Sequence, residues 1–193
     1  MIKTISVYCA SSTQIAPEYF EAARRLGQLM AERNITLVNG AGSMGLMAAS
    51  TDGCMEKGGH TIGIIPQFMI DEGWCHRGMS EVITTQDMHQ RQRRMAELGD
   101  AAIVLPGGCG TLAEMSELIV LKQLGIYLKP IILLNTRNYY EPLLDALKRA
   151  VDEHFMRPEH SNIWQVAQTP EEAIELAINT PLWNVGIRRF AKI

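Results

Sequence analysis

Short, continuously apolar segments alternate with helical patterns along the whole chain, so strands and helices are expected in turn. Strands are expected at residues 4–9, 35–39, 61–65, 81–85, 101–105, 130–135 and 163–167. Helices are expected at residues 17–33, 44–57, 87–98, 112–124, 139–155 and 170–179. The strand segments are apolar at successive positions, which is typical of strands with both faces covered by helices.

Repeated strand–helix units of this kind predict an α/β fold with a parallel sheet. We expect a single-domain, Rossmann-like, doubly wound parallel sheet of about seven strands flanked by helices. No stretch rich in Pro, Gly or Ser divides the chain, so residues 1–193 are expected to form one domain. In such sheets ligands bind outside the carboxyl ends of the strands, so the loops that follow the strands are the places to search.

Composition narrows the classes of partner. A net charge of -3 argues against general binding to nucleic acid or to a membrane surface. No apolar run reaches the roughly 18 residues of a membrane span, and the N-terminal segment reads as a strand and not as a leader. The four cysteines form no CxxC pair and the five histidines never have HExxH spacing. We therefore expect reduced thiols, no metal ion and a cytoplasmic location.

One glycine-rich loop resembles a dinucleotide-binding fingerprint. Gly40, Gly42 and Gly45 satisfy G-x-G-x-x-G between a strand and a helix. That fingerprint also needs an acidic residue at the end of the next strand to hold a ribose hydroxyl, and here that strand ends in IGIIPQ. A nicotinamide or flavin cofactor is therefore disfavoured, and no cofactor is expected. The glycines fit better as a tight turn or as a close approach of the backbone to a ligand.

A single arginine lies on the apolar side of a predicted helix. One stripe of the helix at residues 87–98 carries Met88, Arg91, Met95 and Leu98. A guanidinium on such a stripe needs a partner, because burying an unpaired charge is costly. The alternative is that Arg91 extends along the edge of the stripe into solvent. Its position near a loop of the crevice suits an anion-binding or catalytic role, since arginine binds phosphate with two parallel bonds.

The segment LPGGCGTLAE (residues 105–114) joins an apolar strand to a helix through a glycine-rich turn. Backbone N–H groups and the helix dipole make such a turn a phosphate site. Thr111 and Glu114 also fit a capping box, in which the two residues satisfy the amides of the helix N-terminus. The competing interpretation is catalytic. A carboxylate one turn from a bound phosphate can stabilise the oxocarbenium-like state that forms when an N-glycosidic bond breaks.

These motifs resemble those of the LONELY GUY-type phosphoribohydrolases. PGGCGTLAE matches the pattern PGGxGTxxE, and DMHQRQRRM is similar to the partner motif around an invariant arginine. YCASS, GSMGLM, GIIP, YYEPLL and FMRPEH extend the resemblance over roughly residues 4–170. The resemblance implies hydrolysis of the N-glycosidic bond of purine nucleoside 5′-monophosphates, either AMP or N6-modified AMP such as cytokinin nucleotides. The products would be free base and ribose 5-phosphate.

The resemblance also implies roles for individual residues. Arg91 and Glu114 match the catalytic pair, and Glu81 matches an acidic residue near the substrate sugar. The residues expected to bind substrate are Ser11, Ser12, Gly42, Met44, Glu81, Gly107, Gly108, Cys109, Gly110 and Thr111. The family forms homodimers to which the helix after the PGG turn contributes. Members of the family have often carried the name lysine decarboxylase, but no lysine here has a context that suggests a pyridoxal phosphate Schiff base.

The chain departs from the family pattern at three places. Gln92 follows the arginine where the family usually has lysine, and Ala113 replaces the first of two glutamates. The second glycine-rich loop reads NGAG instead of YGGG. These departures leave a second hypothesis open, namely a nucleotide-binding or cofactor-carrier protein that uses the same PGGxGT loop without hydrolysis.

Overall fold

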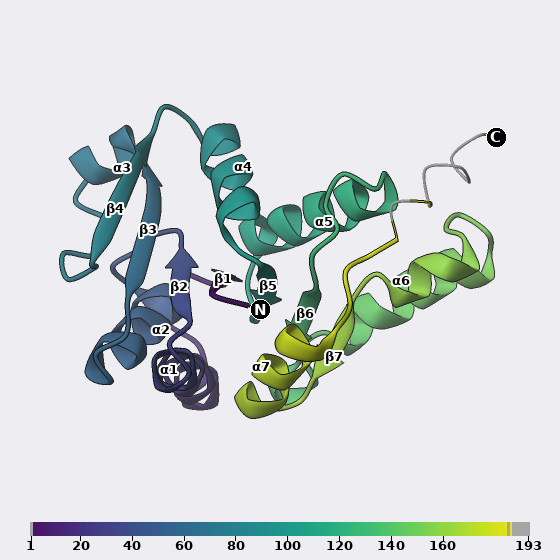
Figure 1. Cartoon of the computed structure of the whole chain (residues 1–193), viewed down its shortest axis with the longest axis horizontal. Coiled ribbons are helices and arrows are strands. Elements are labelled where there is room, and N and C mark those ends of the chain that lie inside the picture. The colour runs from purple at the N-terminus through teal and green to yellow at the C-terminus, as the bar shows by residue number, and fades with distance from the viewer. Residues whose placement is uncertain (1, 185, 187–193) are drawn as a thin grey trace.

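A computed structural model describes residues 2–184 and 186 and contains one seven-stranded sheet with parallel pairing throughout (Figure 1). The strands are β1 (Thr4–Tyr8), β2 (Thr36–Asn39), β3 (Thr61–Pro66), β4 (Glu81–Thr85), β5 (Ala101–Val104), β6 (Ile131–Leu134) and β7 (Gln165–Ala167). Their order is β4-β3-β2-β1-β5-β6-β7. The expected doubly wound parallel sheet is confirmed.

Helices cover both faces of this sheet. They are α1 (Pro17–Glu32), α2 (Gly45–Glu56), α3 (Gln67–Asp71), α4 (Met88–Leu98), α5 (Cys109–Gln123), α6 (Glu141–Asp152) and α7 (Pro170–Asn179), with short 3-10 turns η1 (Thr136–Asn138) and η2 (Pro158–Asn162). Side chains of α1, α2 and α7 form one core with the sheet, and those of α4 and α5 form the other. Figure 1 shows these two layers on opposite sides of the strands.

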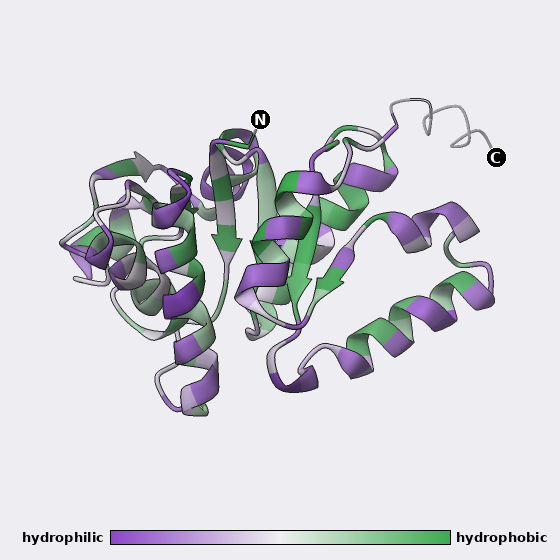
Figure 2. Cartoon of the chain, turned by 60° about the horizontal axis from the view of Figure 1, so that its bottom comes forward, coloured by the Kyte–Doolittle hydropathy of each residue, from purple (hydrophilic) through white to green (hydrophobic). Residues whose placement is uncertain are grey.

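The buried strand positions explain why the strands read as continuous apolar runs. All four residues of β5 and all four of β6 are buried, because helices pack on both faces. Figure 2 shows these strands in the green of hydrophobic residues, whereas α6 alternates green and purple along its length. Among the described residues, no helix is both long and apolar enough to cross a membrane.

The boundaries differ from expectation at several places. Helix α5 begins at Cys109, three residues before the predicted start, and α3 was not expected. Strand β2 begins one residue late and β7 is reduced to three residues. The expected domain of residues 1–193 includes residues 1, 185 and 187–193, which lie outside the described part of the chain.

The topology places a crevice at the centre of the sheet. From β1 the chain winds through β2, β3 and β4 to one edge and then returns to β5 on the other side of β1. Successive crossovers therefore leave β1 and β5 in opposite directions, and their loops separate at the carboxyl edge. The loops after these two strands carry the serine pair and the PGG turn noted in the sequence.

Candidate active site

A cleft of about 660 Å³ opens at this switch point. It is lined by nine of the residues expected to bind or act on substrate: Ser11, Ser12, Gly42, Met44, Arg91, Gly108, Gly110, Thr111 and Glu114. Gly107 lies in the turn behind the lining, and Cys109 is exposed at the first position of α5. The fold thus gathers residues from the loops after β1, β2 and β5 and from α4 and α5.

Glu81 lies elsewhere. It is the first residue of β4 and is exposed, with Ile62 as its partner across the ladder. In a parallel sheet the first residue of a strand lies at the amino edge, opposite the loops that form the cleft. The expectation that Glu81 lies near the substrate sugar is therefore corrected.

The centre of the site is a buried ion pair between α4 and α5. Arg91 Nη1 donates a 2.9 Å hydrogen bond to Glu114 Oε1, and Arg91 Nε donates to the carbonyl oxygen of Ile64 at 3.1 Å. Arg91 is 6% exposed and Glu114 is 8% exposed. Burial of a guanidinium is tolerated when its donors are satisfied in this way. The alternative in which Arg91 extends into solvent is wrong.

Gly40 makes room for this arginine. A Cβ atom built on Gly40 would lie 1.7 Å from Arg91 Nη2, so only glycine fits beneath the guanidinium. Gly45, in contrast, has φ +65° at the start of α2 and packs against the backbone of Ser11. Gly40 and Gly45 of the G-x-G-x-x-G pattern are therefore required by local packing and backbone conformation.

The PGG turn presents an uncapped helix N-terminus to the cleft. Helix α5 has Gly108 as its N-cap residue and no side chain bonded to its first amides. Thr111 and Glu114 lie inside the helix, and Glu114 bonds to Arg91 instead of to a cap. The capping-box interpretation is therefore wrong. The free N–H groups and the helix dipole make this end of α5 suited to an anion.

A second helix begins at the same cleft. Helix α2 starts at Gly45 after the N-cap residue Met44, also without a side-chain cap. Ser11 and Ser12, exposed in the loop after β1, line the same cleft, and the backbone of Ser11 packs against Gly45 at the start of α2. Two helix dipoles and two hydroxyls thus favour negative charge at this end of the cleft.

Two tyrosines fix the PGG turn from behind. Tyr139 donates from its hydroxyl to the carbonyl oxygen of Gly107 at 2.7 Å, and Tyr140 donates to that of Leu105 at 2.6 Å. Thr111 Oγ1 would lie 2.1 Å from a Cβ on Gly107, so the turn is closely packed on its own helix. In the sequence the YY pair belongs only to a motif of the family resemblance, because its contacts with the turn join residues more than 30 positions apart.

The loop after β2 is held by Asn39, the first residue of NGAG. The side chain of Asn39 is fully buried, accepts from the backbone N–H of Ala41 at 2.9 Å and donates to Thr51 Oγ1 at 2.9 Å. Ala41 has φ +55°, a left-handed conformation that favours glycine. Asn39 thus stabilises a strained alanine at the position where the family pattern has glycine.

Opposing influences act on the pKa of the Glu114 carboxyl. Burial raises the pKa of Glu114 above its ordinary value of 4.5, Arg91 opposes that rise, and the neighbouring Glu117 carboxylate adds to it. Burial also raises the pKa of the Cys9 thiol in the cleft wall, so this cysteine is held as a neutral thiol.

Several lining residues were not assigned from the sequence. Gln92 and Ala113, the two departures beside the catalytic motifs, both line the cleft. Met47, the last residue of GSMGLM, also lines it, as do Trp74 and Met69, which belong to no pattern that marks a site. Among the described residues, no group of three or more His, Cys, Asp or Glu side chains is placed to hold a metal ion.

Comparison with known proteins identifies the family. The profile of a family described as "Possible lysine decarboxylase" matches residues 47–177. Cytokinin riboside 5′-monophosphate phosphoribohydrolase LOG7 of Arabidopsis thaliana is 42% identical over 172 residues, covering 89% of this chain and 79% of that protein. LOG5 of the same plant is 40% identical over 173 residues, covering 90% and 76%. The chain belongs to the LONELY GUY-type phosphoribohydrolase family.

Membership of this family of nucleotide-hydrolysing enzymes confirms the resemblance of the two motifs. The fold is shared more widely. The molybdenum cofactor binding protein of Rippkaea orientalis aligns with a TM-score of 0.69 at 26% identity, covering 91% of this chain and 95% of that one. Relatives at about 40% identity are thus named as phosphoribohydrolases, whereas the cofactor-binding protein is more distant in sequence.

Proposed function

We propose that this protein hydrolyses the N-glycosidic bond of purine nucleoside 5′-monophosphates, AMP or N6-modified AMP, and releases free base and ribose 5-phosphate. The observation that carries the proposal is the buried Arg91–Glu114 pair in the same cleft as the uncapped N-terminus of α5. The activity for which the LOG7 and LOG5 relatives are named supports the same reaction.

The 5′-phosphate binds at the start of α5 in this proposal. The amides of Gly108, Gly110 and Thr111 have no side-chain cap, so they are free to donate to phosphate oxygens. Ser11 and Ser12 add hydroxyl donors from the opposite loop. Gly107 and Cys109 shape the turn without lining the cleft, so their part in binding is to hold the amides in place.

Glu114 acts on the ribose ring of the bound nucleotide in this proposal. The bond from C1′ to the base nitrogen breaks with its electron pair leaving on the base, and positive charge develops on the ribose ring. The Glu114 carboxylate stabilises that charge and accepts a proton from the water that bonds to C1′. The departing base takes up a proton, so that water is divided between the two products.

Arg91 acts on the same carboxylate. Its bond to Glu114 Oε1 fixes the orientation of the carboxylate and favours its ionised form. Three of its contacts are to the protein interior, namely Gly40, Ile64 and Glu114, so the guanidinium is held rigidly. Lining the cleft, it is also placed to contact the substrate.

The second hypothesis, a nucleotide-binding or cofactor-carrier protein, has one observation in its favour. The fold is shared with the molybdenum cofactor binding protein of Rippkaea orientalis, and Gln92 and Ala113 alter the cleft. The higher identity to the phosphoribohydrolases and the retained Arg91–Glu114 pair favour hydrolysis.

We propose further that the chain acts as one domain in a cytoplasmic homodimer, without cofactor or metal. Val120, Leu124 and Ile126 are 49%, 47% and 61% exposed on and just after α5, the helix that the family resemblance places in the interface. Apolar side chains exposed together are typical of an interface between subunits. Sedimentation equilibrium tests the assembly, and a Leu124→Glu variant should dissociate it.

A panel of nucleotides tests the function. The wild-type protein is incubated with AMP, N6-isopentenyl-AMP and adenosine, and free base is measured by chromatography. The proposal predicts release from the monophosphates and little from adenosine, because adenosine has no phosphate for the α5 N-terminus. AMP that binds tightly and is recovered intact would favour the carrier instead.

A further inference from the structure

The wall of the cleft contains a tryptophan, Trp74, whose side chain is exposed although the packing of the core does not require it. Trp74 is 46% exposed and lines the cleft, whereas Trp164 and Trp183 are partly buried against the core under α4 and α5. Large aromatic side chains contribute most to stability when they are buried. An indole presented to a cleft is more consistent with ligand contact.

The backbone that carries Trp74 is firmly attached to the glycine-rich loop. The carbonyl oxygen of Trp74 accepts from the Ser43 N–H at 2.8 Å, and its own N–H donates to the Met69 carbonyl oxygen at 3.0 Å. The next residue, Cys75, forms an antiparallel bridge with Gly42. The indole is therefore mounted on a segment with fixed geometry, as a binding surface requires.

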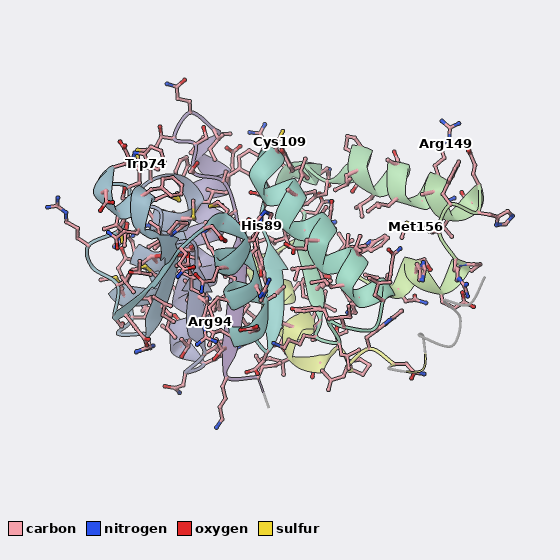
Figure 3. The ribbon with its side chains drawn as sticks, turned by 90° about the horizontal axis from the view of Figure 1, so that it is seen from above. Trp74, His89, Arg94, Cys109, Arg149 and Met156 are labelled. Atoms are coloured by element: carbon pink, nitrogen blue, oxygen red, sulfur yellow. The ribbon has the colours of Figure 1, made fainter. Side chains whose placement is uncertain are left out.

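The lining of the cleft combines two kinds of surface. The start of α5 and the serine pair offer N–H and hydroxyl donors, whereas Trp74, Met69 and Met88 offer apolar side chains. Figure 3 shows Trp74 and Cys109 toward the same side of the molecule, with Arg94 on the other. The phosphate of a nucleotide suits the hydrogen-bond donors of this lining, and its base suits the apolar side chains.

We propose that Trp74 is the stacking platform for the purine base, a role that rests on the proposed nucleotide site. An indole stacks on any base because every base has a π-face, and Met69 and Met88 contact such a ring through polarisable sulfur. The base is thereby held flat at a fixed distance from the bound phosphate. Trp74 is a binding residue and takes no part in the bond cleavage.

Fluorescence of Trp74 tests this role directly. The chain contains three tryptophans, so Trp164→Phe with Trp183→Phe leaves Trp74 as the sole tryptophan, which is excited selectively over tyrosine. Glu114→Gln is added so that AMP is not consumed during the titration. We expect AMP to quench the emission saturably, and ribose 5-phosphate, which has no base, to bind without quenching.

Affinities measured by calorimetry complete the test, in the Glu114→Gln background with the other tryptophans retained. Trp74→Ala should weaken AMP binding about tenfold or more and leave ribose 5-phosphate binding unchanged. Trp74→Phe should restore part of the loss. Phe68→Ala is the matched control, because Phe68 is 50% exposed on the adjacent α3 and does not line the cleft.

The outcomes separate this role from the proposed reaction. Equal weakening of AMP and ribose 5-phosphate in Trp74→Ala would overturn the platform, as would unchanged AMP affinity or an AMP complex without quenching. Base-specific binding through Trp74 combined with no release of adenine by the wild type would uphold the platform and reject the reaction.

Discussion

Arg91 and Glu114 lie on different helices and meet in a buried ion pair, with Nη1 donating to Oε1 at 2.9 Å. Their exposed fractions of 6% and 8% leave little water to screen the pair. A buried pair of this kind is rarely a gain in stability over apolar side chains. Its position in the wall of a cleft, beside an uncapped helix N-terminus, gives it a chemical purpose instead.

Glu114→Gln should abolish most of the activity. The amide keeps the size of the side chain and an oxygen that can accept from Arg91, but it can neither take a proton from water nor neutralise a positive sugar. We expect kcat for AMP to fall by about 10²–10⁴-fold while AMP still binds. Steady-state kinetics and calorimetric binding measure the two quantities. A variant with near wild-type kcat would remove Glu114 from the chemistry.

Glu117→Gln should shift the pH profile. Glu114 acts ionised, so activity falls as the pH drops through its raised pKa. The Glu117 carboxylate adds to that rise, so its removal lowers the pKa of Glu114 and moves the acidic limb of kcat/KM to lower pH. Loss of the positive charge in Arg91→Gln removes the opposing influence and should move the limb to higher pH. An acidic limb of kcat/KM at the same pH in the wild type, Glu117→Gln and Arg91→Gln would contradict this assignment.

Gly40→Ala tests whether activity requires the observed position of the Arg91 side chain. The new Cβ would lie 1.7 Å from Arg91 Nη2, so the guanidinium has to move and Glu114 moves with it. Displacements of about 1 Å can reduce a rate by about 100-fold, and a loss of that size in kcat is expected.

Gly58→Ala serves as the contrast to Gly40→Ala. Gly58 has φ +69° with nothing within 4 Å of the added Cβ, and it lies just past α2. Its replacement should lower the free energy of unfolding by about 1–2 kcal/mol with kcat unchanged. If Gly40→Ala behaves in this way instead, the placement of Arg91 by Gly40 is refuted.

Tyr139→Phe should weaken substrate binding. The hydroxyl bond to the Gly107 carbonyl oxygen steadies the turn whose amides bind phosphate in the proposed site. A single hydrogen bond contributes about 0.5–1.5 kcal/mol, so KM for AMP should rise by roughly 2- to 10-fold with little change in kcat. An unchanged KM would show that the turn holds its shape without Tyr139.

The strands of the sheet could be predicted because each one is marked by its own continuous run of apolar residues. Runs such as residues 101–105 and 130–135 are apolar at every position, and burial on both faces is the ordinary reason for that. The need of Arg91 for a partner was likewise visible in the spacing of one helix. Its partner was indicated by motif resemblance, and only the fold gives the distance.

The remainder depends on long-range contacts. The start of α5 was missed because Gly108 and Gly110 are poor helix formers, and the threonine–glutamate spacing favoured a later cap. Trp74 carries no pattern, since the bridge from Cys75 to Gly42 that places it joins residues far apart in sequence. The resemblance implies that Glu81 lies near the substrate sugar, but the direction of β4 puts this first residue of the strand at the amino edge of the sheet, away from the cleft.

The most direct measurement is the product analysis of AMP incubated with the wild-type protein. Hydrolysis at the N-glycosidic bond predicts free adenine and ribose 5-phosphate in equal amounts, increasing with time and with protein concentration. AMP recovered intact from its complex, or converted to adenosine and phosphate, would contradict the central claim.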